Sequence, residues 1–483
     1  MKKIGLVLGL LLFGLFLLLP TPEGLSPEGM RAGAVAVLMA VWWMTEAIPL
    51  YATSLLPLVL YPLLGIMNAK EAAAPYAEPT IFLFMGGFFL AMAMQRWGLH
   101  RRVALCVIQI LGTQPRRLLL GFMIATALIS MWVSNTATTM MIYPIGLALI
   151  TQFPIKDRSR FASALMLGIA YSASIGGVGT LIGTPPNAIF AGQAKLLFPD
   201  LEEVSFLKWM LVGVPYILLF LPMAWLYLSF IHIKTIVLEG DPRVLKEEME
   251  RLGPVSRGEI WVSLVFLLTV LGWIFREEMH FGSFVIPGWT NLLGVEKWVH
   301  DATVVIAASL LLFIIPVNLK KGEFLLNWEW AAKIPWGVLV LFGGGFSLAV
   351  SFQETDLADW MGGRLTGLMK IPLPLFITAL CYGVIFLGEL TSNTAQTAML
   401  MPILGSTAKS MGIHPYLLMI PATMSASSGF MLPVATPPNA IVFGSGILTI
   451  RQMLKAGFVL DLLGGLLVIL VLYLIAIPVF GLG

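Results

Sequence analysis

Three short motifs occur twice along the chain, in the same order, and this internal repeat constrains the fold more than any other feature. Phe-Met-Gly-Gly-Phe at 84–88 returns as Phe-Gly-Gly-Gly-Phe at 342–346, a separation of 258 residues. The two copies of Ser-Asn-Thr-Ala are also separated by 258 residues, and the two copies of Thr-Pro-Pro-Asn-Ala-Ile are separated by 252 residues. Two halves with the same ordered motifs are expected to fold alike. We place the repeats at 31–235 and 258–483.

The environment of the chain follows from its lack of charge. Only 11% of the 483 residues are charged and 58% are hydrophobic, whereas about 25% of the residues of soluble domains are charged. This composition excludes a soluble enzyme, a nucleic-acid-binding protein and a disordered chain. Two cysteines are too few for a disulfide framework or a thiolate metal site. We therefore expect an all-α polytopic protein of the inner (plasma) membrane.

Apolar stretches of about 20 residues predict the membrane spans. The N-terminal stretch follows two lysines and has no small-residue cleavage site before Pro20, so we expect residues 1–30 to form a transmembrane helix and an outer loop, not a signal peptide. The charged segment 236–257 is expected to be a cytoplasmic linker between the repeats. About eleven spans are predicted in all. Those that the hydropathy pattern marks most clearly lie near 4–20, 31–49, 50–67, 80–95, 208–232, 260–275, 302–316, 335–352 and 456–480.

Two longer apolar regions, 103–152 and 371–411, do not fit single spans. With the N-terminus in the cytoplasm, most of the 29 Lys and Arg residues lie on the cytoplasmic side only if each region enters and leaves on one side. The first region then opens to the cytoplasm and the second to the outside, and the C-terminus lies outside. We therefore expect two oppositely oriented re-entrant hairpins in an inverted-topology repeat, an architecture of many secondary transporters.

The Ser-Asn-Thr motifs lie inside these predicted hairpins. Polar groups at membrane depth are tolerated only where they are buried in protein or line a cavity. If the two hairpin tips meet at the middle of the membrane, they bring together Asn135, Thr136, Asn393 and Thr394. The alternative is that these small polar residues only hold helices closely together. Two copies, each followed by Thr-Pro-Pro-Asn, favour a binding site.

The Thr-Pro-Pro-Asn motifs are expected to break the helices predicted at 161–193 and 414–447. The first proline disfavours helical geometry at the preceding threonine, and proline donates no backbone hydrogen bond. Carbonyl groups just before the breaks, at Gly183 and Ala435, suit a hard cation such as Na⁺, and the half-helix that follows begins with its positive end, which suits an anion. Neither motif contains Lys or Arg. An anionic substrate would therefore be held by neutral donors, helix ends and cations bound with it.

Glu46 and Glu389 are the carboxylates that we expect within the membrane, where such residues are functional candidates. Glu46 lies at a predicted helix end before Pro49, which favours a structural hydrogen bond. For Glu389 two interpretations stay open, namely local positioning and a role in proton or cation coupling. The five histidines lie at predicted helix ends or loops and are expected to be solvated.

At these motifs, and at Trp-Trp-Met-Thr-Glu-Ala-Ile-Pro at 42–49, the chain resembles the divalent anion:sodium symporter (DASS, INDY-type) family of di- and tricarboxylate transporters over nearly its whole length. The resemblance implies a homodimer in which each protomer has a scaffold domain and a transport domain that moves as an elevator. It also implies a set of residues that contact the substrate carboxylates: Asn135, Thr136, Asn393, Thr394 and Pro437.

The same resemblance implies two Na⁺ sites. The residues that match the first site are Ser130, Ser134, Asn135 and Gly183. Those that match the second are Gly388, Ser392, Asn393 and Ala435. Na⁺-coupled relatives often have a hydroxyl residue at the position of Gly388, so the chain lacks one side-chain ligand there, although a backbone carbonyl can serve.

We therefore expect an importer of C4-dicarboxylates such as succinate, malate and fumarate, with Na⁺ as the coupling ion and no organic cofactor. Because the family includes Na⁺-independent members, a dicarboxylate or citrate exchanger of the same fold is the alternative. A membrane-embedded enzyme or a channel is more distant. An enzyme would need a cluster of His, Asp or Cys at the middle of the membrane, which the sequence lacks, and a channel would not need two opposed hairpins around one site.

Overall fold

Helices make up most of the computed structural model, which describes residues 2–112, 114–150, 155–233, 243–281, 284–364 and 371–482. This agrees with the expected helical membrane protein, because a helix satisfies its backbone hydrogen bonds within one segment where water is excluded. Its first half contains α1 (Lys2–Leu18), α2 (Pro27–Thr45), α3 (Leu50–Thr53), α4 (Leu56–Leu63), α5 (Ala69–Ala73), α6 (Pro79–Arg96), α7 (Leu99–Leu111), α8 (Pro115–Ser130), α9 (Asn135–Ile150), α10 (Ile155–Gly177), α11 (Pro185–Leu197) and α12 (Phe206–Leu228).

The second half follows the same plan after a short helix. It contains α13 (Arg243–Leu252), α14 (Arg257–Ile274), α15 (Trp289–Leu293), α16 (Asp301–Ile314), α17 (Trp328–Ala331), α18 (Trp336–Glu354), α19 (Leu357–Arg364), α20 (Leu373–Gly388), α21 (Asn393–Ser410), α22 (Tyr416–Ala426), α23 (Pro437–Phe443), α24 (Ile450–Val471) and α25 (Ile477–Phe480). Two small antiparallel sheets pair β1 (Met279–Phe281) with β2 (Phe284–Ile286), and β3 (Pro316–Asn318) with β4 (Glu323–Phe324).

Within the described residues, four helices are long and apolar enough to cross a membrane. They are Phe206–Ile231, Arg257–Ile274, Trp336–Glu354 and Ile450–Phe480, and the bent pair Ala69–Ala77 and Pro79–Arg96 makes a fifth if it counts as one span. The other apolar helices are shorter. The span expected near 50–67, for example, is divided into α3 and α4, and Pro57 at the start of α4 has no N–H group with which to continue the preceding helix.

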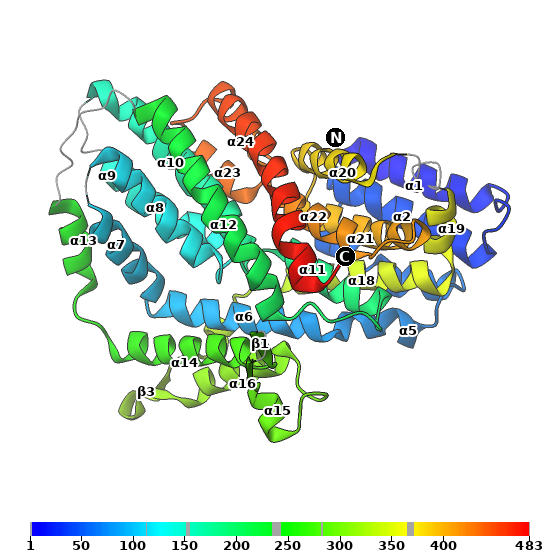
Figure 1. Cartoon of the computed structure of the whole chain (residues 1–483), viewed down its shortest axis with the longest axis horizontal. Coiled ribbons are helices and arrows are strands. Elements are labelled where there is room, and N and C mark those ends of the chain that lie inside the picture. The colour runs from blue at the N-terminus through cyan, green and yellow to red at the C-terminus, as the bar shows by residue number, and fades with distance from the viewer. Residues whose placement is uncertain are drawn as a thin grey trace.

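The elements of the two halves correspond in order. Helix α6 corresponds to α18, the pair α8–α9 to α20–α21, the pair α10–α11 to α22–α23, and α12 to α24. The halves also contact each other reciprocally, because α9 packs on α23 while α21 packs on α11. Figure 1 shows α8 and α9 on one side of the molecule, α20 and α21 on the other, and α11 and α22 between them.

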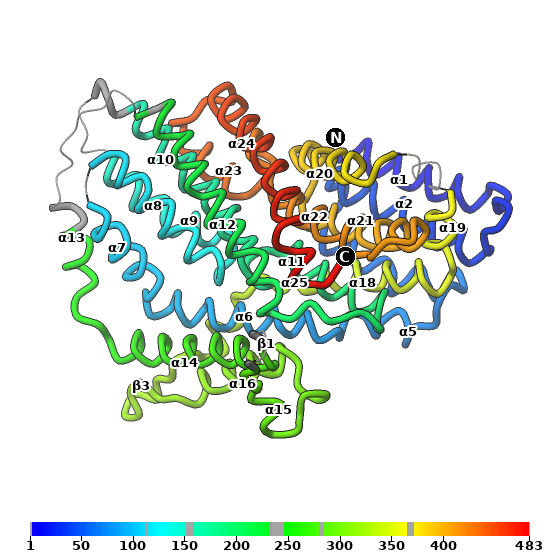
Figure 2. Tube along the Cα trace, in the orientation of Figure 1, coloured from blue at the N-terminus to red at the C-terminus, as the bar shows by residue number. Residues whose placement is uncertain are grey.

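The helix pairs of the two halves differ in how they begin. The region 103–152, expected to be one hairpin, is divided by Gly112, which has a φ of +87° and ends α7. The helix pair that carries Ser-Asn-Thr is therefore α8–α9, and α7 packs against α8 as a separate helix. In the second half α20–α21 lies within the expected range 371–411. Figure 2 shows α14, α15 and α16 on one side of α6, and the helix pairs α8–α9 and α20–α21 on its other side.

Both Thr-Pro-Pro-Asn motifs interrupt a helix. Thr184 has φ −144° and ψ 143°, and Thr436 has φ −140° and ψ 149°, so both are extended residues immediately before a new helix. In each case the first proline occupies the first turn of that helix, where its missing N–H costs nothing. A loop therefore separates α10 from α11 and α22 from α23.

Candidate functional site

The loop between α10 and α11 is held in place by buried side chains. Asn187 Nδ2 donates to the carbonyl oxygens of Gly177 (3.1 Å), Val178 (3.3 Å) and Thr180 (2.8 Å). Trp209 Nε1 donates to the same oxygen of Val178 at 2.8 Å. Asn187 and Trp209 are both fully buried. The carbonyl groups that lose their helical partners at the break are thus satisfied by side chains, as buried backbone groups require.

The side chain of Asn135, the first residue of α9, lies among oxygen atoms from three elements. Ser130 Oγ lies 2.8 Å from Asn135 Oδ1 and 2.7 Å from the carbonyl oxygen of Ala173, and its single proton is donated to one of these two oxygens at a time. When the amide is turned so that its nitrogen faces this cluster, it donates to Gly183 O (3.3 Å) and Ala173 O (3.1 Å). When Asn135 Oδ1 faces the cluster instead, the oxygens of Ser130, Asn135, Ala173 and Gly183 face one another with only the hydroxyl proton of Ser130 among them. A cation stabilises such an arrangement of uncharged oxygens.

Two glycines allow this close approach. A β-carbon on Gly177 would collide with Asn135 Oδ1, and one on Gly183 would collide with the carbonyl oxygen of Gly177. Gly177 must therefore lack a side chain if α9 is to reach the break, and Gly183 must lack one if the two ends of the break are to approach each other. Ser134, the remaining residue expected at the first cation site, accepts a hydrogen bond from the amide of Ala137 at 3.4 Å and so caps α9.

The second break is held in a corresponding way. Asn439 Nδ2 donates to the carbonyl oxygens of Gly429 (3.2 Å) and Leu432 (3.0 Å). These three residues lie 252 positions after Asn187, Gly177 and Thr180, which is the separation of the Thr-Pro-Pro-Asn motifs themselves. The asparagine of the motif therefore holds the loop open in both halves.

Two buried carboxylates attach the second loop to its neighbours. Glu389 Oε1 and Oε2 accept from the amides of Met431 (2.9 Å) and Leu432 (2.8 Å), and Asp461 Oδ1 accepts from the amide of Phe430 (3.1 Å). Glu389 is 2% exposed and Asp461 is fully buried. These contacts favour the positioning role over the coupling role for Glu389, because both of its oxygens hold backbone groups of the loop.

The residues expected at the second cation site lie around this loop. Measured from the position that a β-carbon would have on Gly429, Ala435 Cβ is 3.3 Å away and the carbonyl oxygen of Gly388 is 3.8 Å away. Ser392 caps α21 by accepting from the amide of Ala395 at 3.5 Å. Asn393 Oδ1 is buried and has no hydrogen-bond partner among the described residues.

The residues expected to contact the substrate are more accessible. Thr136 and Thr394 are half-buried, and Pro437 is exposed at the start of α23. Asn135 and Asn393 begin α9 and α21, where the first N–H groups of a helix have no helical acceptor. Over the part of the chain that the structure describes, the side chains and backbone at the starts of α9 and α21 make their hydrogen bonds within their own repeat. No hydrogen bond there joins the start of α9 to the start of α21.

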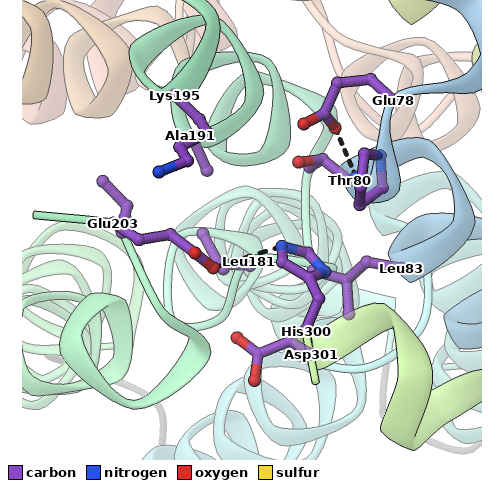
Figure 3. Close-up of a pocket in the computed structure, with 11 residues that line it drawn as sticks. Glu78, Thr80, Leu83, Leu181, Ala191, Lys195, Glu203, His300 and Asp301 are labelled. Atoms are coloured by element: carbon purple, nitrogen blue, oxygen red, sulfur yellow. Dashed lines mark hydrogen bonds and ion pairs between the residues drawn. The ribbon is translucent and has the colours of Figure 1, made fainter. Parts of the chain in front are cut away.

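A small cavity lies elsewhere, at the end of α11 and the starts of α6 and α16 (Figure 3). Its lining includes Glu78, Lys195, Glu203 and His300. His300 Nε2 lies 3.2 Å from Glu203 Oε1. Burial alone would raise the pKa of Glu203, but the hydrogen bond from His300 and the positive charges of His300, Arg276 and Lys195 together hold that pKa below its ordinary value. The cavity contains none of the predicted site residues.

Three sequence expectations need correction. His100 is not solvated but 4% exposed, and its Nδ1 lies 3.1 Å from the carbonyl oxygen of Met94. Glu46 is an exposed C-cap whose carboxylate lies 3.7 Å from Lys2 Nζ, and not a buried hydrogen-bonded group. Asp461 was overlooked as an acidic residue inside an apolar helix, although a lone carboxylate in such a segment is a signal by itself.

Sequence reasoning also did not assign the roles of Asn187 and Asn439. Their repetition within Thr-Pro-Pro-Asn was visible, but the carbonyl groups that they hold come from the opposite end of each break.

The comparisons with known proteins point in one direction. The family model described as the sodium:sulfate symporter transmembrane region matches residues 1–482. A sodium-dependent dicarboxylate transporter (SdcS) of Staphylococcus saprophyticus is 44% identical over 99% of this chain and 92% of its own length. The transporter of the same name from Staphylococcus aureus gives the same values.

Two solved structures share the fold. The YdaH transporter of Alcanivorax borkumensis superposes with a TM-score of 0.51 at 12% identity, covering 98% of this chain and 95% of its own. MtrF of Neisseria gonorrhoeae, described as one of a class of antimetabolite efflux pumps, has a TM-score of 0.54 at 12% identity, with 99% and 96% covered. At this identity the likeness concerns the fold alone.

Proposed function

The chain belongs to the sodium:sulfate symporter family, and from this premise we propose that it imports C4-dicarboxylates, such as succinate, malate and fumarate, together with Na⁺. The family and the curated relatives are transporters, so the chain is a multi-pass membrane transporter and not an enzyme. The observation that carries the proposal is the convergence of Ser130 Oγ, the Asn135 side chain and the carbonyl oxygens of Ala173 and Gly183, which suits a monovalent cation when Asn135 Oδ1 faces it. The relatives named for sodium-dependent dicarboxylate transport supply the substrate class.

In this proposal each hairpin tip binds one Na⁺. The first ion is held by Ser130, Ser134, Asn135 and Gly183. The second is held by Gly388, Ser392, Asn393 and Ala435. Oxygens of broken helices and of hydroxyl and amide side chains are typical Na⁺ ligands in transporters. Asn187 and Asn439 contribute indirectly, because they keep the loops open and leave Gly183 and Ala435 outside regular helix.

The substrate carboxylates bind between the two tips, at Asn135, Thr136, Asn393, Thr394 and Pro437. The free N–H groups at the starts of α9 and α21 and the positive ends of these helices attract anions. The Asn and Thr side chains add neutral donors. Because neither motif contains Lys or Arg, the bound Na⁺ ions supply the positive charge that a dianion requires.

The coupling of dicarboxylate transport to Na⁺ follows from the attraction between the bound cations and the bound dianion. A dicarboxylate that enters a site without fixed cations loses its hydration and gains little in return unless Na⁺ is already bound. Each ligand therefore raises the affinity for the other, and thermodynamic linkage makes that effect reciprocal. Transport of the dianion without Na⁺ is suppressed because the empty tips are poor anion sites.

We also infer the arrangement in the membrane. The protein has about eleven spans and two oppositely oriented re-entrant hairpins, with the N-terminus in the cytoplasm and the C-terminus outside. The repeats 31–235 and 258–483 together form two domains. The scaffold domain provides the homodimer interface, and the transport domain moves by an elevator mechanism. The reciprocal packing of α9 on α23 and of α21 on α11 supports this plan, because two-fold related repeats contact each other in matched pairs.

Uptake of labelled succinate into proteoliposomes tests the proposal. With no dicarboxylate inside, we expect uptake when Na⁺ is outside and only background uptake when choline replaces it. Uptake that needs internal dicarboxylate and proceeds at full rate without Na⁺ would instead identify a Na⁺-independent dicarboxylate or citrate exchanger of the same fold.

A further inference from the structure

The two hairpins differ at one corner of the proposed cation sites. Gly388 of the second repeat lies 258 positions after Ser130 of the first. The hydroxyl of Ser130 is fully buried and contacts the side chain of Asn135 at 2.8 Å. Gly388 has no side chain, so residue 388 cannot provide the corresponding oxygen.

Gln396 occupies the space that Gly388 leaves. A β-carbon on Gly388 would lie 3.2 Å from Gln396 Oε1, 3.5 Å from Asn393 Oδ1 and 3.9 Å from the carbonyl oxygen of Ala426. Ala426 is the last residue of α22, and carbonyls at such a helix end lack helical partners. Three oxygens therefore converge on the place where the first repeat has its serine side chain.

The amide of Gln396 is oriented by a hydrogen bond on its far side. Nε2 donates to the carbonyl oxygen of Val384 in α20 at 2.9 Å, so Oε1 is directed toward Gly388 and Asn393. Gln396 is 1% exposed. Among the described residues neither Gln396 Oε1 nor Asn393 Oδ1 has a hydrogen-bond partner. Buried acceptors are rarely left unpaired, and a cation is a partner that several converging oxygens can share.

We propose that Gln396 Oε1 is a ligand of the second Na⁺ site and replaces the hydroxyl that Gly388 cannot supply. The inference rests on the proposed function, since it takes Na⁺ as the coupling ion. The corresponding residue of the first repeat is Thr138, which is too short to reach this position and donates its hydroxyl to the carbonyl oxygen of Val133 at 3.4 Å. Ser130 Oγ in the first repeat and Gln396 Oε1 in the second thus supply the matching side-chain oxygen from different positions of the hairpin.

A binding measurement on the purified full chain tests this assignment without relying on transport. In detergent and without dicarboxylate, the rise in Tm is followed as Na⁺ replaces K⁺ at constant ionic strength. Ligand that binds only the folded state raises its stability. We expect a sodium response steeper than first order in the natural protein. In Gln396→Met, which keeps the shape but removes the oxygen, we expect the rise in Tm to be less steep and to begin at an about tenfold higher Na⁺ concentration.

A double substitution provides the rescue. Gln396→Thr combined with Gly388→Ser recreates the residues of the first hairpin at both positions, and we expect it to restore the steep sodium response that Gln396→Thr alone loses. Gly388→Ser alone should not improve the response, because its β-carbon would lie only 3.2 Å from Gln396 Oε1. Failure of the double variant to exceed Gln396→Thr would overturn the proposal.

Gln193→Met is the matched control. Gln193 is also a fully buried amide whose Nε2 is anchored, to the carbonyl oxygens of Gly345 and Ala398, but no predicted cation ligand surrounds it. We expect the Na⁺ concentration at which its Tm begins to rise, and the slope of that rise, to equal those of the natural protein. An equal loss in Gln193→Met and Gln396→Met, or no loss in Gln396→Met, refutes the role of Gln396. If the natural protein itself shows neither a Na⁺-dependent Tm nor Na⁺-dependent uptake, the proposed function fails as well.

Discussion

Phe84 and Phe342 hold the same position in the two repeats and pack against each other, with ring centroids 4.9 Å apart and an angle of 76° between the ring planes. Equivalent residues of two units related by a two-fold rotation can touch only near the rotation axis. The pair therefore marks the centre of the relation between the halves. The glycines that follow each phenylalanine let neighbouring side chains approach closely there, as Val305 approaches Gly86.

Removing the amide at either hairpin tip should nearly abolish uptake. In Asn135→Ala and Asn393→Ala we expect the affinity for succinate to fall roughly tenfold to a hundredfold, because a hydrogen bond to a charged group is worth about 1.5–3 kcal/mol. Labelled succinate uptake in proteoliposomes measures the effect. Asn291→Ala, at an exposed position in α15, is the matched control and should transport normally. Near-native affinity in both tip variants would show that the tips do not bind the substrate.

Replacing the asparagines that hold the loops should destabilise the protein. Asn187→Leu removes the side-chain donor of the Gly177 and Thr180 carbonyls, while Val178 keeps Trp209. Asn439→Leu removes that of Gly429 and Leu432, so we expect both variants to lower the Tm by similar amounts. Each unsatisfied buried acceptor costs about 1–3 kcal/mol. Thermal unfolding in detergent provides the measurement, with Asn291→Leu as the exposed control. Equal Tm values for all three variants would contradict this role.

Uptake should require Na⁺ and should rise more steeply than first order in its concentration, because we propose that two ions bind with each dianion. Ser130→Ala removes a side-chain oxygen from the first site, so we expect a higher half-saturating Na⁺ concentration. Initial uptake rates over a Na⁺ series measure both quantities. Ser309→Ala is the control, since Ser309 is also a buried helix serine bonded to a backbone carbonyl, that of Val305. Succinate counterflow at full rate in Na⁺-free medium would rule out obligatory coupling.

The opposed orientation that we propose for the hairpins predicts opposite accessibility of their ends. In a background with Cys106→Ser and Cys381→Ser, a membrane-impermeant thiol reagent should label Gln114→Cys only from the cytoplasm and Lys409→Cys only from outside. Gln114 precedes α8 and Lys409 lies in the last turn of α21, and both are exposed. The physical basis is the excess of Lys and Arg that we expect on the cytoplasmic side. Labelling of both positions from the same side would exclude an inverted repeat.

Local rules account for the features that were predicted correctly. Proline lacks an N–H group and disfavours helix at the preceding residue, so the extended conformation of Thr184 and Thr436 followed from the motif itself. Hydropathy located α12, α14, α18 and α24 for the same reason, because the length of an apolar segment reflects the thickness of the bilayer. The separate helix α7 was missed, since a glycine inside an apolar stretch does not by itself show where the chain turns.

The sequence by itself determined that the chain is a helical membrane protein, that it consists of two matching halves, and where its helices break. These properties depend on composition, repetition and the covalent structure of proline. Only the tertiary structure decided which groups meet at the breaks: that Asn187 and Asn439 hold the loops, that Glu389 and Asp461 share the second one, and that Gln396 faces Gly388. The physical reason is that hydrogen bonds between distant segments depend on how helices pack, and packing is set by the shapes of many side chains at once.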